Sequence, residues 1–198
     1  MASSQVELYS MALSLLGDAP VSSVTETEGS RAINRLYAIT LDAKIQSHNW
    51  NAFQMRANLA LVNATPLYDF SYMFQLPQDP FCLQVLETNL TTSDPWRIET
   101  YETTTPSASY RVLLANVNSV SILYLARVTD VTRWGALFAD AMAAELAYRV
   151  CYALTRNATL EDVLGKKAEA LWQKGRSRDG QEGKPRNNLQ STVLTNVR

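Results

Sequence analysis

The sequence predicts an α+β fold: an antiparallel bundle of N- and C-terminal helices, an inserted small antiparallel β module and an extended C-terminal arm. Apolar residues recur at helical spacing near both ends of the chain, and at strand spacing in its middle. Neither terminal pair of helices is long enough to bury its apolar faces alone, so the pairs are expected to pack together. We expect a helical bundle from residues 1–55 and 129–175, a β-rich insertion over 56–128, and a flexible arm over 176–198.

Two helices are predicted at the N-terminal end. Ser4 and Glu7 have the spacing of a capping box, and Gly17 is expected to end the helix that begins there. A second helix is expected from about residue 29 to about residue 47. Its predicted apolar stripe consists of Ala32, Leu36, Ile39 and Ala43, widened by Ile33 and Ile45.

The spacing of apolar residues changes after residue 56. Aromatic residues at positions 68, 70, 72 and 74 alternate with less apolar ones, which predicts a half-buried strand. Four more strands are expected within residues 81–88, 96–102, 110–116 and 119–128, separated by turns rich in Ser and Thr. Short strands at this density indicate a small antiparallel sandwich or barrel-like module.

Helical spacing returns in the last third of the chain. Asp130 or Thr132 is expected to cap a long helix that runs to about Leu154, and this helix is apolar nearly all round, so it should be central. A final helix is predicted from the Thr159 cap to about Gly175. Its inward residues are expected to be Leu160, Val163, Leu164 and Leu171.

Charge divides the chain into an acidic body and a basic end. The net charge is −1 overall, but the residues from Lys174 onward carry +4 and the rest carry −5. The chain as a whole is therefore not a nucleic-acid binder of the basic type. Cys82 and Cys151 stand in apolar surroundings, typical of buried hydrophobes in a reducing cytosol. No signal peptide is expected, and the charges at 140, 145 and 149 indicate that the apolar stretch 134–154 is a buried helix and not a membrane span.

Catalytic and metal-binding patterns are scarce. His48 is the one histidine, without a nucleophile motif around it, and is expected to be a capping or loop residue at the end of the second helix. The spacing of Cys and His predicts no metal site, and no glycine-rich phosphate loop occurs, so no cofactor is expected. A pair of carboxylates could still meet in space and hydrolyse a glycosidic bond. The acids considered for such a pair are Glu26, Glu28, Asp130, Asp140 and Glu145, although Glu145 has Arg149 four residues away as a salt-bridge partner.

Four segments, in order, resemble the tail tubular protein A family of short-tailed phages. The segments read ALSLLGDAPVSS, IQSHNWNAFQMRANLAL, FSYMFQLPQDPFCLQVL and LYLARVTDVTRWGALFADAMAAELAYRVCYALT, and the similarity spans most of residues 5–175. Proteins of this family are head–tail adaptors, or gatekeepers. The resemblance implies a helical bundle with a β insertion, which agrees with the pattern of apolar residues.

The resemblance also implies a function. The chain would be a structural subunit of a twelve-membered ring between the portal protein and the tail nozzle protein, through which DNA passes without specific binding. The ring would be part of the virion tail, assembled in the host cytoplasm, with no enzyme activity, cofactor, metal or membrane contact. The arm is expected to dock on the portal through Arg176, Arg178, Lys184, Arg186, Leu189, Val193 and Leu194.

Two other functions remain open from the sequence. One is a cell-wall hydrolase that acts on peptidoglycan during phage entry through a pair of the acids named above. The other is a DNA-binding accessory protein that uses the basic arm as a sequence-independent electrostatic contact.

Overall fold

The computed structural model describes residues 4–104 and 107–182. Its fold is α+β, as predicted, with N-terminal helices, two small antiparallel sheets and two long packed C-terminal helices. The helices are α1 (Gln5–Ser14), α2 (Glu28–Gln46), α3 (Ala136–Thr155) and α4 (Ala158–Asp179). The strands are β1 (Gln54–Asn58), β2 (Ala60–Leu61), β3 (Tyr72–Gln75), β4 (Cys82–Thr88), β5 (Trp96–Thr104), β6 (Ser107–Ala115) and β7 (Ser121–Ala126).

Local sequence signals place the first two helices. The Ser4 hydroxyl caps α1 by accepting the Glu7 N–H at 3.2 Å, as predicted. Gly17 has a φ of 84°, a conformation that glycine adopts without a steric penalty, and it lies just after α1. Thr27 and Ser30 form a capping box at the start of α2.

The predicted apolar stripe of α2 is partly wrong. Ile39 is 66% exposed and Ala43 is also exposed, while Ala32 and Leu36 are half-buried. The buried face includes the larger side chains four residues apart, namely Ile33, Tyr37, Leu41 and Ile45. Burial of this face is more favourable, because it removes more apolar area from water than burial of the predicted stripe with its two alanines would.

The strands form two antiparallel sheets. One has the order β1-β7-β4 and the other the order β2-β3-β6-β5. Arg111 on β6 links them, because its guanidinium donates to the carbonyl oxygen of Cys82 on β4 at 2.7 Å. The strand predicted from the aromatic alternation is shorter than expected: β3 begins at Tyr72, and residues 66–70 form a loop in which Asp69 has a φ of 65°. Met73 and Phe74 are both buried because each belongs to a different apolar cluster.

The C-terminal helices begin at other residues than predicted. Asp130 caps the short 3₁₀ turn Val131–Arg133 through Thr132, and α3 starts later, after Gly135. The cap of α4 is Asn157 and not Thr159. The helix continues through Asp179, so the first four residues of the predicted arm are helical. Val163, predicted to face inward, is 55% exposed, because Leu164 and Ala168 take the buried face of α4.

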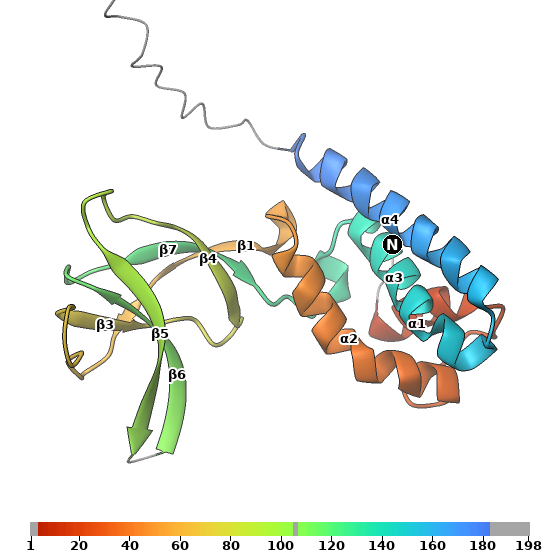
Figure 1. Cartoon of the computed structure of the whole chain (residues 1–198), viewed down its shortest axis with the longest axis horizontal. Coiled ribbons are helices and arrows are strands. Elements are labelled where there is room, and N and C mark those ends of the chain that lie inside the picture. Colours follow the sequence, from red (N-terminus) through yellow and green to blue (C-terminus); the bar gives the residue numbers. More distant parts are fainter. Residues whose placement is uncertain (1–3, 105–106, 183–198) are drawn as a thin grey trace, which may run out of the picture.

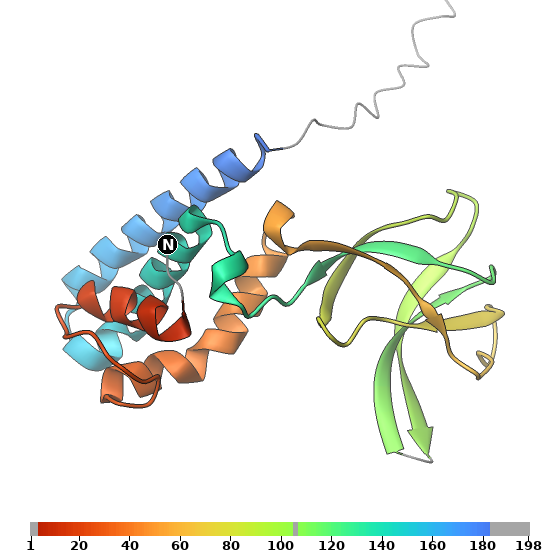
Figure 2. The ribbon, with the colours of Figure 1, turned by 180° about the vertical axis from the view of Figure 1, so that it is seen from behind.

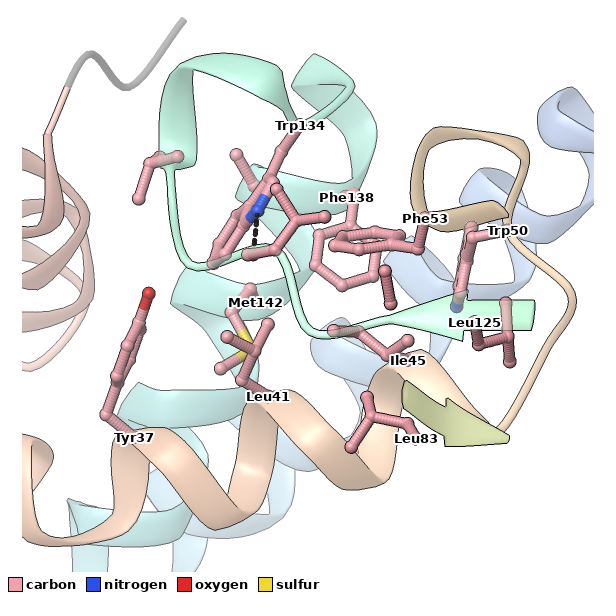
Figure 3. Close-up of a cluster of buried hydrophobic side chains, with 14 of the residues drawn as sticks. Tyr37, Leu41, Ile45, Trp50, Phe53, Leu83, Leu125, Trp134, Phe138 and Met142 are labelled. Atoms are coloured by element: carbon pink, nitrogen blue, oxygen red, sulfur yellow. Dashed lines mark hydrogen bonds between the residues drawn. The ribbon is translucent and has the colours of Figure 1, made fainter. Parts of the chain in front are cut away.

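One continuous apolar core joins the helices to the β1-β7-β4 sheet. Helix α3 packs against α1, α2 and α4, and the cluster in Figure 3 contains Leu41 and Ile45 of α2 beside Leu83 of β4 and Leu125 of β7. The Trp134 indole donates to the carbonyl oxygen of Val128 at 2.9 Å, the dashed line in Figure 3, so this buried ring has its hydrogen-bond partner.

The helices and the sheets lie at opposite ends of an elongated molecule (Figures 1 and 2). The chain passes from the helices to the sheets through β1 and returns through β7, and these two strands pair with each other. No helix in the described residues is both long and apolar enough to cross a membrane.

Candidate interaction surfaces

The described part of the predicted arm lies on the last turns of α4. Arg176 forms an ion pair with Glu169 at 2.8 Å, and the Arg178 guanidinium donates to the side-chain oxygen of Gln181 at 3.3 Å. The remaining predicted docking residues lie outside the described residues. They are Lys184, Arg186, Leu189, Val193 and Leu194.

The five acids considered for catalysis have separate surroundings. Glu26 accepts hydrogen bonds from the N–H groups of Ser22 and Ser23 and from the Ser22 hydroxyl, which lower its pKa. Asp130 accepts from the hydroxyl and N–H of Thr132, with the same effect on its pKa. Asp140 is exposed on α3, and Glu28 lies in the first turn of α2. Within the described ranges, no two of the five share a hydrogen-bond partner.

Glu145 is the one of these acids that lies in the core. Lys44 of α2 contacts its carboxylate at 3.0 Å, Arg149 of α3 donates to it at 2.8 Å, and the Trp172 indole of α4 donates at 3.2 Å. Burial raises the pKa of Glu145, but these hydrogen bonds and the charge of Lys44 outweigh that effect and lower it. The predicted pairing with Arg149 is confirmed, and Glu145 ties three helices together.

His48 joins the end of α2 to the end of α4. Its Nε2 lies 3.0 Å from a carboxylate oxygen of Asp179, and its ring stands edge-on against Trp50 at 4.7 Å between centroids. The other carboxylate oxygen of Asp179 accepts the Asn51 N–H. The predicted loop position of His48 is confirmed, and its contact holds the C-terminal end of α4 beside the start of the β module.

The two cysteines are buried free thiols. Burial raises the pKa of Cys82 to about 11, although the charge of Arg111 opposes this shift. A thiol with such a pKa is almost entirely protonated at neutral pH, and it is a poor nucleophile. The described residues contain no group of three or more His, Cys, Asp or Glu side chains placed to hold a metal ion.

A loop on the β module presents two large side chains to solvent. Leu67 is 97% exposed and Tyr68 is 71% exposed. The loop is held at its base, since Phe70 packs against the buried Met73 cluster and the Ser71 N–H donates to Asn116 at 2.9 Å. We call Leu67 and Tyr68 together the Leu67 knob. A fixed loop that exposes adjacent apolar residues has the character of a protein-binding site.

Two further apolar features lie on the helices. A pocket of about 230 Å³ opens where α3 and α4 meet the start of the β module, and we call it the Phe53 pocket. Its uncharged lining includes Trp50, Ala52, Phe53, Leu137, Phe138 and Gly175. Its charged lining residues are Arg178, Asp179 and Glu182. Other exposed large apolar residues of the helices are Tyr148 and Tyr152 on α3 and Val163 on α4.

No family model matches the chain, and no curated protein matches it either. The fold and the surfaces described above are therefore the observations on which a function can be argued.

The ion pair of Glu145 with Arg149 was predicted from the sequence, but the exposed loop that carries the Leu67 knob was not. The aromatic alternation indicated a strand through this segment, although Pro66 and Asp69 within it are residues typical of turns. The Phe53 pocket could not be foreseen, because its residues come from three separate parts of the chain.

Proposed function

We propose that this chain is a structural subunit of a ring-shaped head–tail adaptor in a short-tailed phage. In this proposal its four helices form an antiparallel bundle into which the β module is inserted. The ring would contain twelve subunits, sit between portal and tail nozzle in the virion tail, and let DNA pass without specific binding. The resemblance of residues 5–175 to the tail tubular protein A family is the source of these details.

The observation that supports assembly most is the presence of different apolar surfaces on separate parts of one molecule. The Leu67 knob lies on the β module, while the Phe53 pocket and the exposed tyrosines lie on the helices. A ring of identical subunits is built from head-to-tail contacts, in which each subunit uses two unlike surfaces. Two separate apolar surfaces on one chain meet that requirement.

The net charge of the body is compatible with a DNA conduit. The residues before Lys174 carry −5, and an anionic wall repels phosphates, so it gives DNA no electrostatic hold. A basic lining would retain the DNA by releasing its counterions. The basic side chains Arg176 and Arg178 lie in the last turn of α4, where Arg176 pairs with Glu169.

The proposal is tested by measuring the mass of the purified chain with light scattering, alone and mixed with rings of the portal protein from the same phage. A complex with the portal that contains about twelve copies of the chain is the expected result. A chain that stays monomeric with the portal at every concentration and salt condition contradicts the proposal. A chain that is monomeric on its own does not contradict the proposal, because segments of a subunit can become ordered, and the ring can assemble, only on docking to the partner.

A further inference from the structure

The Phe53 pocket has an aromatic wall and the size of a side-chain site. The Phe138 ring packs against the Trp50 ring at 5.1 Å and against the Phe53 ring at 4.7 Å between centroids. Gly175 of α4 leaves room beside them, since a Cβ there would lie 3.4 Å from the Trp50 ring. The volume of about 230 Å³ is smaller than the ~300–1,000 Å³ of sites for drug-sized ligands, and it suits an aliphatic side chain.

The start of α3 adds hydrogen-bond donors to this pocket. Gly135, Ala136 and Leu137 line it, and no side chain caps the helix within the described residues. The first N–H groups of a helix have no acceptor within the helix itself. The carbonyl oxygens of a peptide laid across the pocket can accept from these groups, so the pocket suits a peptide better than a purely apolar ligand.

The charged residues of the pocket have both signs, and two of the three are already engaged. The Asp179 carboxylate contacts His48, and the Arg178 guanidinium donates to the side chain of Gln181. Glu182 forms no ion pair in the part of the chain that the structure describes. A highly charged occupant of either sign would meet repulsion from one of these residues, so the mixed lining favours an uncharged segment.

The sequence that follows Glu182 has that character. Lys184 and Arg186 come first, and both can pair with the free carboxylate of Glu182. Residues 187–197, which we call the 187–197 segment, carry no charge. The apolar side chains of this segment are Leu189, Val193, Leu194 and Val197. The chain itself therefore supplies basic residues for the edge of the pocket and apolar residues for its interior.

The 187–197 segment is also within reach. Glu182 lines the pocket, so the connection begins at the site itself. An extended chain spans at most ~3.3–3.6 Å per residue, so residues 183–188 can cover about 20 Å and turn back over a pocket of this size. A segment tethered this closely has an effective concentration in the ~mM range at the pocket. A second copy would need a comparable concentration of free chain, so the segment of the same chain is the favoured occupant.

We propose that the 187–197 segment docks in the Phe53 pocket of its own chain, with its apolar side chains against the Trp50 and Phe138 rings and with Lys184 and Arg186 beside Glu182. This contact goes beyond the proposed ring and does not depend on it. Only its role rests on the proposed function: the apolar residues expected to dock on the portal would stay covered in the free subunit until the portal takes them from the pocket.

Disulfide trapping in the full-length chain tests the contact. Ala52→Cys places a thiol at the pocket, and Leu194→Cys places one on the segment, while the natural cysteines are buried. Ser177→Cys is the matched control, because Ser177 is exposed and closer along the chain to the segment but does not line the pocket. The pair of Ala52→Cys with Leu194→Cys is expected to form an intramolecular disulfide about tenfold faster than the pair of Ser177→Cys with Leu194→Cys.

Two results of the trapping experiment would overturn the inference. One is an equal rate for the two pairs, which would mean random collision of the segment with the surface. The other is a disulfide-linked dimer whose yield rises with protein concentration, which would assign the pocket to the segment of a second copy. Thermal unfolding of each variant checks that the fold is retained.

Hydrogen exchange supplies a readout that needs no disulfide. The amides of the 187–197 segment are expected to be protected in the natural chain and to exchange about tenfold faster in Leu189→Ser with Leu194→Ser, or in Ala52→Lys at the pocket. Gln190→Ser with Thr195→Ser is the control, because it changes polar residues of the same segment. Amides that are unprotected in the natural chain, or whose protection survives Ala52→Lys, contradict the inference. Both experiments use the free chain, so their failure leaves the proposed ring standing, and absence of a ring leaves their outcome unchanged.

Discussion

Glu145 is a carboxylate held inside an apolar helix by donors from three helices. It is 6% exposed, and it accepts from Lys44, Arg149 and Trp172. Removing a charge from such a cluster leaves cations near the core without their partner. We expect Glu145→Gln to lower the free energy of unfolding by about 2–3 kcal/mol at pH 7, measured by urea denaturation. Asp140→Asn on the same helix is the control, because Asp140 is exposed.

The lowered pKa of Glu145 predicts how the free energy of unfolding changes with pH. Its pKa in the folded protein lies below the usual 4.5, so its contribution to stability is present above that value and is lost as pH falls through the folded pKa. The difference in unfolding free energy between the natural chain and Glu145→Gln should therefore shrink from pH 6 toward pH 3. A difference that stays constant over this range would show that the pKa is not lowered.

Gly29 marks a close approach between the first two helices. A Cβ at this position would lie 2.7 Å from a methyl carbon of the buried Leu13. We expect Gly29→Ala to lower the unfolding free energy by about 1 kcal/mol, since overpacking outweighs the better helix propensity of alanine. The double variant Gly29→Ala with Leu13→Val should lose less unfolding free energy than the sum of the two single variants, because valine lacks the methyl carbon that the new Cβ would meet. Additive losses would mean that Gly29 and Leu13 do not crowd each other.

At the scale of elements, one ion pair fastens the β module to α2. The Arg127 guanidinium makes two hydrogen bonds to the carboxylate of Asp42, and it lies over the Phe81 ring at 4.8 Å. Both bonds need the planar fork of arginine, so Arg127→Lys should not preserve the contact. We expect it to cost about 0.5–1 kcal/mol, since the pair is partly exposed. A double-mutant cycle with Asp42→Asn measures the coupling, and a value near zero would contradict this account.

Sequence signals were strongest for elements whose information is local. Ser4 fixed the start of α1, and the apolar composition of α3 correctly indicated a central helix. The signals were weaker where packing against the rest of the fold decides which residues are buried and where a helix begins. Ile39 fits a helical stripe as well as Ile33 does, and only packing against the rest of the fold leaves it exposed. Likewise, Asp130 has the residue type of a helix cap, but the backbone makes a 3₁₀ turn before α3 begins.

At the scale of the whole molecule, the arrangement of surfaces matters more than any single site. The knob and the pocket are formed by residues that sequence spacing does not connect, so they could be found only once the helices and sheets had been placed. The resemblance to the tail tubular protein A family implies a ring of such subunits, and this ring stays a prediction.

Negative-stain images of the chain assembled on portal rings test the central claim most directly. The account predicts a closed annulus of subunits coaxial with the portal, about twelve in number, with an open channel along the axis. Portal rings that bear no added annulus, or open chains of subunits that never close, would contradict it.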